Sequence, residues 1–332
     1  MEQETAAAFV DMGTTNTRVW LARGGQILAS ARAQIGVRDS ARDGTNARLR
    51  EGLRDLLAEV IRQSRSHANF ADPRCVIAAG MITSSLGLSE VPHLEAPAGL
   101  RELALGVRRF QFPDVTELPI LLVPGIRTGK LTSDAAQTCA ADIMRGEETL
   151  CMGLIANGLA PLPGVVLNLG SHWKAISLDE KCRIVGSITS LSGEMIHAVQ
   201  TTTILASALP QERPQVLDTE WLEAGMTEQR ASGLARALFC VRLLEQAKAT
   251  TAEQRLAFLA GATIASDLDA LLSKNVLRKR KKVTLIGHPA LAGAWRHALD
   301  AASIGATIVT EQQTDNALLA GLGQILGESD FA

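Results

Sequence analysis

Two short turns in the sequence pair glycine with small hydroxyl residues at the ends of apolar runs. The first contains Gly13, Thr14 and Thr15, and the second contains Gly170 and Ser171. Glycine lets the backbone approach an anion closely, while successive N–H groups and hydroxyls donate hydrogen bonds to phosphate oxygens. One such turn alone is typical of an ordinary hairpin, but two that match each other predict a pair of phosphate-binding turns.

An acidic residue precedes only the first of these turns. Asp11 stands two residues before Gly13, whereas the neutral Asn168 holds the matching place before Gly170. A carboxylate beside bound phosphate is repulsive unless a hard cation lies between them. Asp11 therefore predicts a Mg²⁺ site, bridged by water, and the second turn is expected to hold phosphate without a metal.

Two glutamates open a predicted helix that runs toward Ala156. Glu147 and Glu148 follow Arg145 and Gly146 shortly before the second turn. Phosphoryl transfer to an alcohol needs a carboxylate that accepts the hydroxyl proton. The local pattern fits helix-capping surface glutamates equally well, but the position just before the second turn favours a catalytic base.

The elements that would position these residues occur in the same order twice. Val10–Thr15 matches Leu167–His172 at an offset of 157 residues, and the same offset places Gln26–Leu28 opposite Arg183–Val185. Strands are predicted at residues 8–11, 17–22, 26–31, 75–79, 120–123, 283–287 and 306–309, and helices at 46–65, 192–208, 227–247, 252–272, 290–300 and 315–326. This order predicts a duplicated α/β domain, and because ligands of such sheets bind at strand ends, the two turns are expected at one cleft.

The composition is that of a globular enzyme with two domains. The chain has 332 residues, of which 46 % are hydrophobic and 20 % charged, and at this length one hydrophobic core gives way to two. The net charge of −2 and the 3 % of aromatic residues argue against nucleic acid or an anionic membrane as a partner. The five cysteines form no CxxC pair, which is typical of reduced thiols in the cytoplasm.

Neither of two candidate segments is expected to target or anchor the chain. The charge-free stretch Thr149–Trp173 contains Pro161 and Pro163, which would leave backbone groups unpaired in lipid. Met1–Ala8 carries two glutamates and no basic residue, unlike a secretory signal. A cytoplasmic protein is therefore expected, and its oligomeric state stays open, with a homodimer included.

Five segments together resemble a known family. Asp11–Arg18 resembles the first phosphate motif of sugar kinases in the actin/heat-shock-protein/sugar-kinase superfamily. With it, Ala79–Met81, Val123–Gly125, Met144–Thr149 and Ser192–Glu194 resemble the 2-keto-3-deoxygalactonate kinase family, in the same order over almost the whole chain. The Met-Arg-Gly-Glu-Glu-Thr run of Met144–Thr149 is the most specific of these segments.

The resemblance implies a fold and an activity. The fold is the duplicated ribonuclease-H-like, actin-like ATPase/sugar kinase fold, with two lobes around a central ATP cleft. Residues 1–160 would form the sugar-binding lobe and residues 161–332 the nucleotide-binding lobe, and the sequence leaves open whether the last helix crosses back. The implied reaction is ATP-dependent phosphorylation of the 6-hydroxyl of 2-dehydro-3-deoxy-D-galactonate.

The resemblance also implies roles for the residues of the two turns and for the acidic pair. Asp11 would position Mg²⁺, Gly13, Thr14 and Thr15 would face the transferring phosphate, and Gly170 and Ser171 would hold the inner phosphates. Glu147 occupies the place of the acidic base, with Glu148 as a close competitor. Gly287, at the end of a predicted strand, would lie near the adenosine.

A sugar acid brings a carboxylate and several hydroxyls, and five residues are candidates to bind it. Arg18 is a planar, permanently charged partner for the carboxylate or for a phosphate. Asn16 can donate to and accept from hydroxyls, and Ser84 and Ser85 follow a predicted strand end. Lys174 follows the second turn. Two other functions stay open, namely a kinase of another sugar acid or amino sugar and a non-catalytic actin-like nucleotide switch.

Overall fold

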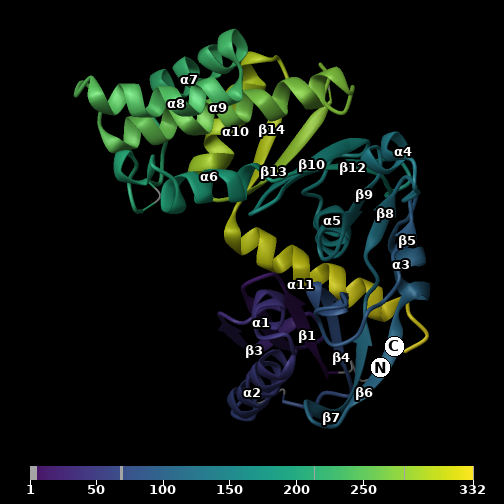
Figure 1. Cartoon of the computed structure of the whole chain (residues 1–332). Helices are drawn as coiled ribbons and strands as arrows, with labels where there is room; N and C mark the ends of the chain where they lie inside the picture. The colour runs from purple at the N-terminus through teal and green to yellow at the C-terminus, as the bar shows by residue number, and fades with distance from the viewer. Residues whose placement is uncertain (1–5, 68–69, 213, 280, 332) are drawn as a thin grey trace. The chain divides into compact units, whose positions relative to one another are not determined.

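Residues 6–67, 70–212, 214–279 and 281–331 are described by the structure, a computed structural model of the chain. The first five residues, which belong to the segment considered above for a targeting signal, lie outside this description. The described chain forms two units, each built around its own sheet (Figure 1). The first unit comprises the residues up to Gly158, Lys181–Gly186 and the segment from Asp315, and the second comprises Leu159–Glu180 and Ser187–Thr314.

A six-stranded sheet with the order β3-β2-β1-β4-β7-β6 forms the centre of the first unit. The strands β1, β2 and β3 are antiparallel, β4 and β7 run parallel to β1, and β6 pairs antiparallel with β7. Their bounds are β1 (Ala6–Met12), β2 (Thr17–Arg23), β3 (Gln26–Ala33), β4 (Val76–Gly80), β6 (Arg108–Phe112) and β7 (Thr116–Leu122). The central strands β1 and β4 are almost entirely apolar and buried, which is typical of strands covered on both faces.

Helices pack on this sheet through apolar stripes. In α2 (Ala47–Ser64), Leu49, Leu53 and Val60 recur at helical spacing and join the core formed with β1 and β4. The prediction of this helix is confirmed. The other short elements of the unit are α1 (Val37–Asp43), the 3₁₀ helix η1 (Met81–Thr83), α3 (Leu100–Gly106), α4 (Ala135–Cys139) and α5 (Glu147–Ala156), with a small sheet of β5 (Leu94–Glu95), β8 (Ile126–Thr128) and β9 (Asp142–Met144).

The last helix, α11 (Glu311–Gly327), crosses α5 at two glycines. A side chain at Gly153 of α5 would lie 1.6 Å from the Ala317 carbonyl oxygen, and one at Gly321 of α11 would lie 2.1 Å from the Thr149 carbonyl oxygen. Neither distance leaves room for a methyl group. The two helix backbones are therefore in direct contact, and this contact fixes α11 against the helix that carries Glu147 and Glu148.

The second unit repeats the first around a five-stranded sheet with the order β12-β11-β10-β13-β14. The hairpin β10–β11 is antiparallel and β13 and β14 run parallel to β10. The bounds are β10 (Gly164–Leu169), β11 (Trp173–Leu178), β12 (Ile184–Ser190), β13 (Lys282–Gly287) and β14 (Ala306–Val309), with α6 (Ser192–Thr202), η2 (Ala206–Ala208), α7 (Thr219–Ser232), α8 (Leu234–Gln246), α9 (Ala252–Ser273) and α10 (Pro289–Ala301). Its core includes Trp173 and Trp295, whose rings meet edge to face at 5.6 Å.

The predicted duplication is confirmed, with one correction in the register. Strands β1 and β10 both pair antiparallel with the next strand and parallel with a later one. Met12 lies opposite Thr17, whereas Leu169 lies opposite Trp173, so the second turn is one residue shorter than the first. The offset of 157 residues therefore does not hold through the hairpin without a gap, as the sequence comparison had assumed.

Two predicted helices were wrong in extent. The helix expected at 227–247 is two helices, α7 and α8, divided at Gly233, whose positive φ of 83° breaks the helical path. The helix expected at 192–208 ends at Thr202. Among the described residues α9 is long and apolar enough to cross a membrane, but 67 % of its apolar window is buried inside the protein, as in a core helix.

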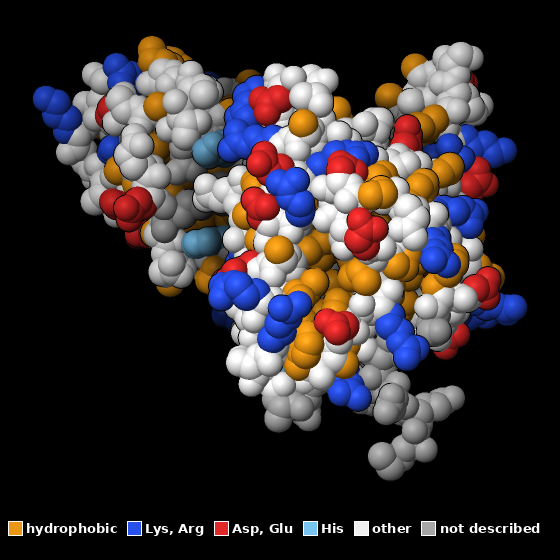
Figure 2. Space-filling view, turned by 90° about the horizontal axis from the view of Figure 1, so that it is seen from below, with side chains coloured by type: hydrophobic (Ala, Val, Ile, Leu, Met, Phe, Trp, Pro, Cys, Tyr) orange, Lys and Arg blue, Asp and Glu red, His pale blue; other side chains and the backbone are white. Residues whose placement is uncertain are grey.

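Charged side chains of both signs are interspersed on the face shown in Figure 2, with apolar side chains between them. Ion pairs occur along α2, where Arg54 lies near Glu51 and Arg62 contacts Glu59. Isolated pairs of this exposed kind contribute little to stability. They do balance charge locally, in keeping with the net charge of −2.

Candidate functional site

The end of β1 brings Asp11 next to two glycines from other segments of the first unit. Met12 lies opposite Gly80 in the parallel pairing of β1 with β4. A side chain at Gly80 would lie 2.4 Å from the Met12 carbonyl oxygen and 3.4 Å from Asp11 Oδ1, and one at Gly146 would lie 3.2 Å from the Gly80 Cα. Both glycines have positive φ, at 90° and 105°. Glycine is thus required at both places for the start of α5 to approach Asp11.

Asp11 shares an arginine with Asp315 of α11. Arg18 lies opposite Asp11 on β2, and its Nε is 3.6 Å from Asp11 Oδ2. Arg18 Nη1 also donates to Asp315 Oδ1, while Arg32 Nη2 donates to Asp315 Oδ2 at 2.9 Å. The sequence analysis missed Asp315. The residues around it in the sequence give no sign that its partners lie on β2 and β3. Asp315 holds the orientation of Arg18.

The surroundings of Asp11 are rich in negative charge. Burial raises the pKa of Asp11 above its ordinary value, and the Arg18 cation opposes that effect. The carboxylates of Glu147 and Asp315 raise the pKa further. A second cation beside Asp11 would therefore reduce the repulsion among these carboxylates.

Glu147 and Glu148 differ in their exposure at the N-terminus of α5. Glu147 Oε2 accepts the backbone N–H of Arg145 at 3.2 Å, and both carboxylate oxygens of Glu148 accept that of Gly146, at 2.7 and 2.9 Å. Glu148 is fully buried, and burial, assisted by the charge of Glu147, raises its pKa to about 7. Glu147 is only half-buried. Of the two, Glu147 is therefore the one that a ligand can reach.

The first glycine turn presents its second half to solvent. The N–H of Gly13 donates to the Asn16 carbonyl at 2.8 Å, and Asn16 Nδ2 donates to Thr15 Oγ1 at 3.1 Å. Gly13 and Thr14 are half-buried, whereas Thr15 and Asn16 are exposed. The hydroxyl and amide side chains predicted to contact ligand thus lie at the surface of the first unit, at the end of the strand that carries Asp11.

The predicted serines follow η1, and they differ in what their hydroxyls can do. Ser84 is buried and its hydroxyl donates to the Met81 carbonyl at 2.7 Å, whereas Ser85 is exposed. The neighbouring Thr83 is fully buried and accepts a hydrogen bond from Arg145 Nη1 at 2.9 Å. This link between η1 and the segment before α5 was missed from the sequence, since no spacing rule joins the two segments.

The second glycine turn rests on the start of α6. Gly170, Ser171 and His172 are all exposed. The Ser171 carbonyl accepts the N–H of Glu194 at 2.7 Å, and a side chain at Gly193 would lie 2.2 Å from the Gly170 carbonyl oxygen. The start of α6 thus supports the backbone of the turn. The exposed residues of the turn remain accessible to a ligand.

Buried polar groups of the second unit fix the strands behind this turn. Lys174 is 4 % exposed, and its Nζ donates to Thr189 Oγ1. The hydroxyls of Ser190 and Ser192 donate to Asp267 Oδ2 at 2.6 and 2.8 Å. Burial raises the pKa of Asp267, and these hydrogen bonds lower it. Lys174 is therefore a buried residue of β11 in this unit.

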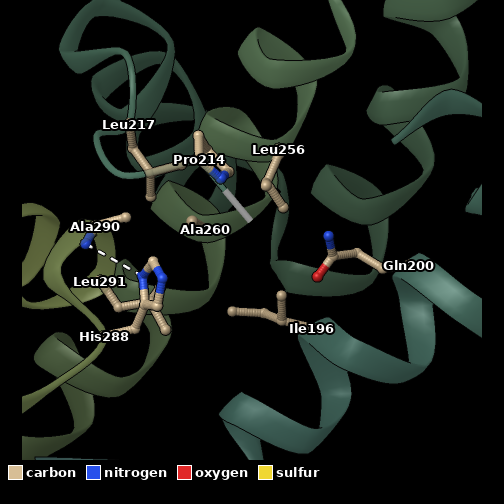
Figure 3. A pocket seen from close by; sticks show the side chains of 9 residues that line it. All are labelled: Ile196, Gln200, Pro214, Leu217, Leu256, Ala260, His288, Ala290 and Leu291. Carbon is tan, nitrogen blue, oxygen red and sulfur yellow. Dashed lines mark hydrogen bonds between the residues drawn. The ribbon is translucent and has the colours of Figure 1, made fainter. Parts of the chain in front are cut away.

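Gly287 ends β13 as Gly80 ends β4. It lies opposite Leu169 with φ at 146°, and a side chain there would lie 2.8 Å from the Leu169 Cβ. The chain then enters α10, where the N–H of Ala290 donates to His288 Nδ1 at 3.4 Å. Beside this start lies the pocket of Figure 3, apolar apart from Gln200 and His288 and lined by Ile196, Gln200, Pro214, Leu217, Leu256, Ala260, His288, Ala290 and Leu291.

The structure thus gathers the predicted residues into two sets. In the first unit, Gly80 and Gly146 bring the end of β4 and the start of α5 next to Asp11, and in the second unit Gly287 lies opposite Leu169, directly before the second turn. The duplicated sheet and the similarity to solved structures together define the fold class of the chain. Over 98 % of its length the chain matches 96 % of the activator of the 2-hydroxyisocaproyl-CoA dehydratase from Clostridium difficile, with 12 % identity and a TM-score of 0.50. The fold is that of actin-like ATPases and sugar kinases, as predicted.

The family follows from the sequence itself. A match to the family described as 2-keto-3-deoxy-galactonokinase spans residues 11–325. The chain therefore belongs to the 2-keto-3-deoxy-galactonokinase family of sugar kinases, which confirms the resemblance noted from its motifs.

Relatives agree with this assignment over nearly their full length. The chain is 26 % identical over 317 residues to the 2-dehydro-3-deoxygalactonokinase of Escherichia coli (strain K12), covering 95 % of this chain and 96 % of the relative. A crystal structure from Sinorhizobium meliloti, assigned to the same activity, matches 96 % of this chain and 98 % of its own, with 25 % identity and a TM-score of 0.75.

Proposed function

We propose that this protein transfers the γ-phosphoryl group of ATP to the 6-hydroxyl of 2-dehydro-3-deoxy-D-galactonate. The observation that carries the proposal is the family match across residues 11–325, which includes both glycine turns and the acidic start of α5. The oxygen of the 6-hydroxyl forms the new bond to the γ-phosphorus, and the bond from that phosphorus to the bridging oxygen of ADP breaks. The hydroxyl proton must go to a base.

Glu147 is our candidate for that base. It is half-buried, lies at a helix N-terminus and acts electrostatically on Asp11. The helix N-terminus stabilises the carboxylate form that can accept a proton. Glu148, fully buried with both oxygens on the Gly146 N–H, serves in this proposal to fix the start of α5.

Mg²⁺ fits beside Asp11 if most of its ligands come from outside the protein. Among the described residues no group of three or more His, Cys, Asp or Glu side chains could hold a metal. Magnesium is commonly held by one or two carboxylates together with substrate phosphates and water, and the negative surroundings of Asp11 suit that arrangement. When bound, the ion would offset charge on the transferring phosphate, which Gly13, Thr14 and Thr15 would also face.

We assign the remaining predicted residues by unit. The first unit would bind the sugar acid through Asn16, Arg18, Ser84 and Ser85. The second unit would hold the inner phosphates at Gly170 and Ser171. The adenosine would lie near Gly287, beside a pocket lined mainly by apolar side chains.

We also propose that the enzyme works in the cytoplasm, on ATP and a small sugar acid, without nucleic acid or membrane. Release of ADP, followed with a panel of sugar acids and amino sugars, tests the function. The expected result is rapid release with 2-dehydro-3-deoxy-D-galactonate and little without sugar. Hydrolysis that no sugar accelerates would instead support the nucleotide switch, and preference for another sugar would replace the substrate.

A further inference from the structure

Arg145, immediately before α5, has an unusual setting in the first unit. Its Nη1 donates to Thr83 Oγ1 at 2.9 Å, and its Nη2 lies 3.4 Å from His93 Nδ1. Thr83 is fully buried, and Arg145 itself is half-buried. Two neutral groups thus orient the guanidinium from different segments of the chain, which leaves its other N–H donors free for a further acceptor.

No carboxylate of the described chain forms a salt bridge with Arg145. The negative charges of Glu148 and Glu90 act on it only from a longer range, and burial is the main reason that its pKa is lowered. The contrast with nearby arginines is clear, because Arg18 is paired with Asp11 and Asp315, and Arg127 contacts Glu95 at 2.5 Å.

His93 contacts the Arg145 guanidinium but carries no negative charge that would neutralise it. Burial, assisted by the charges of Arg145 and Arg127, lowers the pKa of His93 to about 4, so the ring is neutral at physiological pH. A neutral ring whose Nδ1 faces an arginine can accept its hydrogen bond there. Gly125 leaves the space that both side chains fill, since a side chain at that glycine would lie 2.8 Å from Arg145 Cγ and 2.9 Å from His93 Cδ2.

A partly buried cation without an anion is costly unless a ligand supplies one. We propose that Arg145 binds the C1 carboxylate of the sugar acid, and that Thr83 and His93 are positioning residues for it. This inference rests on the proposed function. It favours Arg145 over Arg18 for the carboxylate, because Arg18 already faces two carboxylates whereas Arg145 faces none.

Arg145 stands two residues before the proposed base, Glu147. Arg145 donates its backbone N–H to Glu147 Oε2 at 3.2 Å, so the cation and the proposed base belong to one short segment. The sugar acid carries its carboxylate and its 6-hydroxyl at opposite ends. A planar guanidinium can bind a carboxylate with two parallel hydrogen bonds and so fix the orientation of the whole molecule.

The test compares the sugar acid with its neutral C1 amide as substrates. In the unmodified enzyme, kcat/KM for the acid should exceed that for the amide by about 100-fold. Arg145→Gln should lose about that factor on the acid while keeping amide turnover within about threefold. Arg145→Lys, which keeps the charge but not the planar fork, should show an intermediate loss on the acid.

Arg62→Gln is the matched control, because it removes an arginine of the same unit that already has a carboxylate partner, Glu59, and it should leave the acid-to-amide ratio unchanged. Equal loss of acid and amide turnover in both Arg145 variants would mean that Arg145 serves the fold, and the inference would be wrong. An unmodified enzyme that phosphorylates acid and amide equally would also overturn it, with the proposed function intact. If the unmodified enzyme phosphorylates neither compound, the proposed function itself fails.

Discussion

At the residue scale, the two neighbouring glutamates of α5 have different surroundings despite their identical chemistry. Glu148 turns both oxygens onto the Gly146 N–H and is fully buried, whereas Glu147 accepts one N–H and remains half-buried. A base that serves a substrate hydroxyl must be reachable by it. The structure therefore favours Glu147 among the two candidates that the sequence left open.

Replacing the proposed base tests this choice. Glu147→Gln keeps the shape of the side chain but removes its capacity to accept a proton, so kcat should fall by roughly 10²–10⁴ with little change in the KM for ATP. Steady-state kinetics at saturating sugar acid measures the effect. Turnover that is unchanged in Glu147→Gln but lost in Glu148→Gln would transfer the role to Glu148.

Glu148 should give the folded protein a measurable pH dependence. Burial raises its folded pKa from 4.5 to about 7, so the folded state retains a proton that the unfolded state has lost. The contribution of Glu148 to stability is thus fully present below pH 4.5 and is lost as pH rises toward 7, by about 3 kcal/mol. The Glu148→Gln variant has no carboxyl group at this position and therefore does not lose this stability. The difference between the unfolding free energy of the variant and that of the unmodified protein should therefore rise between pH 4.5 and 8.

Denaturant unfolding at several pH values provides the measurement for Glu148→Gln. The exposed Glu328 offers a matched control, and Glu328→Gln should track the unmodified protein at each pH. A stability difference for Glu148→Gln that is constant from pH 4.5 to 8 would show that Glu148 ionises normally in the fold.

Sequence reasoning could propose residues whose role depends on neighbours along the chain, and it missed residues whose partners lie on distant segments. Asp11 and Glu147 could be proposed because each stands within two residues of a glycine that opens a turn or a helix. Thr83, His93 and Asp315 were not found, since their partners lie on other segments of the fold. Their single-residue patterns are those of ordinary loop and helix residues.

At the scale of elements, the sequence pattern also predicts strand registers and helix ends poorly. The repeated order of strands around the two turns predicted the duplicated sheets, but not that the second turn is one residue shorter. The hydrophobic spacing predicted one helix at 227–247 that continues past Gly233. This happened because α7 and α8 both bury apolar faces against α9, so the apolar pattern runs on from one helix to the next. A periodic pattern reports which face is buried and reports poorly where a helix stops.

The crossing of α5 with α11 makes a prediction at this scale. Gly321→Ala would place a methyl group 2.1 Å from the Thr149 carbonyl oxygen, so the helices must separate, at a cost of about 1–3 kcal/mol. Gly323→Ala, on the same helix, meets nothing within 4 Å and should stabilise α11 by about 0.5–1 kcal/mol. Denaturant unfolding of the two variants measures the contrast, and equal effects would contradict the close packing.

At the scale of the whole molecule, each unit has its own sheet, its own core and its own glycine turn. The duplication has also diverged in charge. Asp11 ends β1, whereas the equivalent strand β10 carries the neutral Asn168. This asymmetry is the reason for assigning the metal and the transferring phosphate to the first unit and the inner phosphates to the second.

Ligands should therefore slow amide hydrogen exchange in different units. ADP should protect the turn at Gly170 and Ser171 and the start of α10. A non-hydrolysable ATP analogue with Mg²⁺ should add protection at Gly13–Thr15, since only it carries a γ-phosphate. The sugar acid should protect the segments around Thr83 and Arg145.

Mass spectrometry of peptides from each segment measures these changes, with the exposed end of α8 as an internal control that no ligand should affect. ADP protection at Gly13–Thr15 and none at the second turn would reverse the assignment, because it would place the inner phosphates on the unit that carries Asp11.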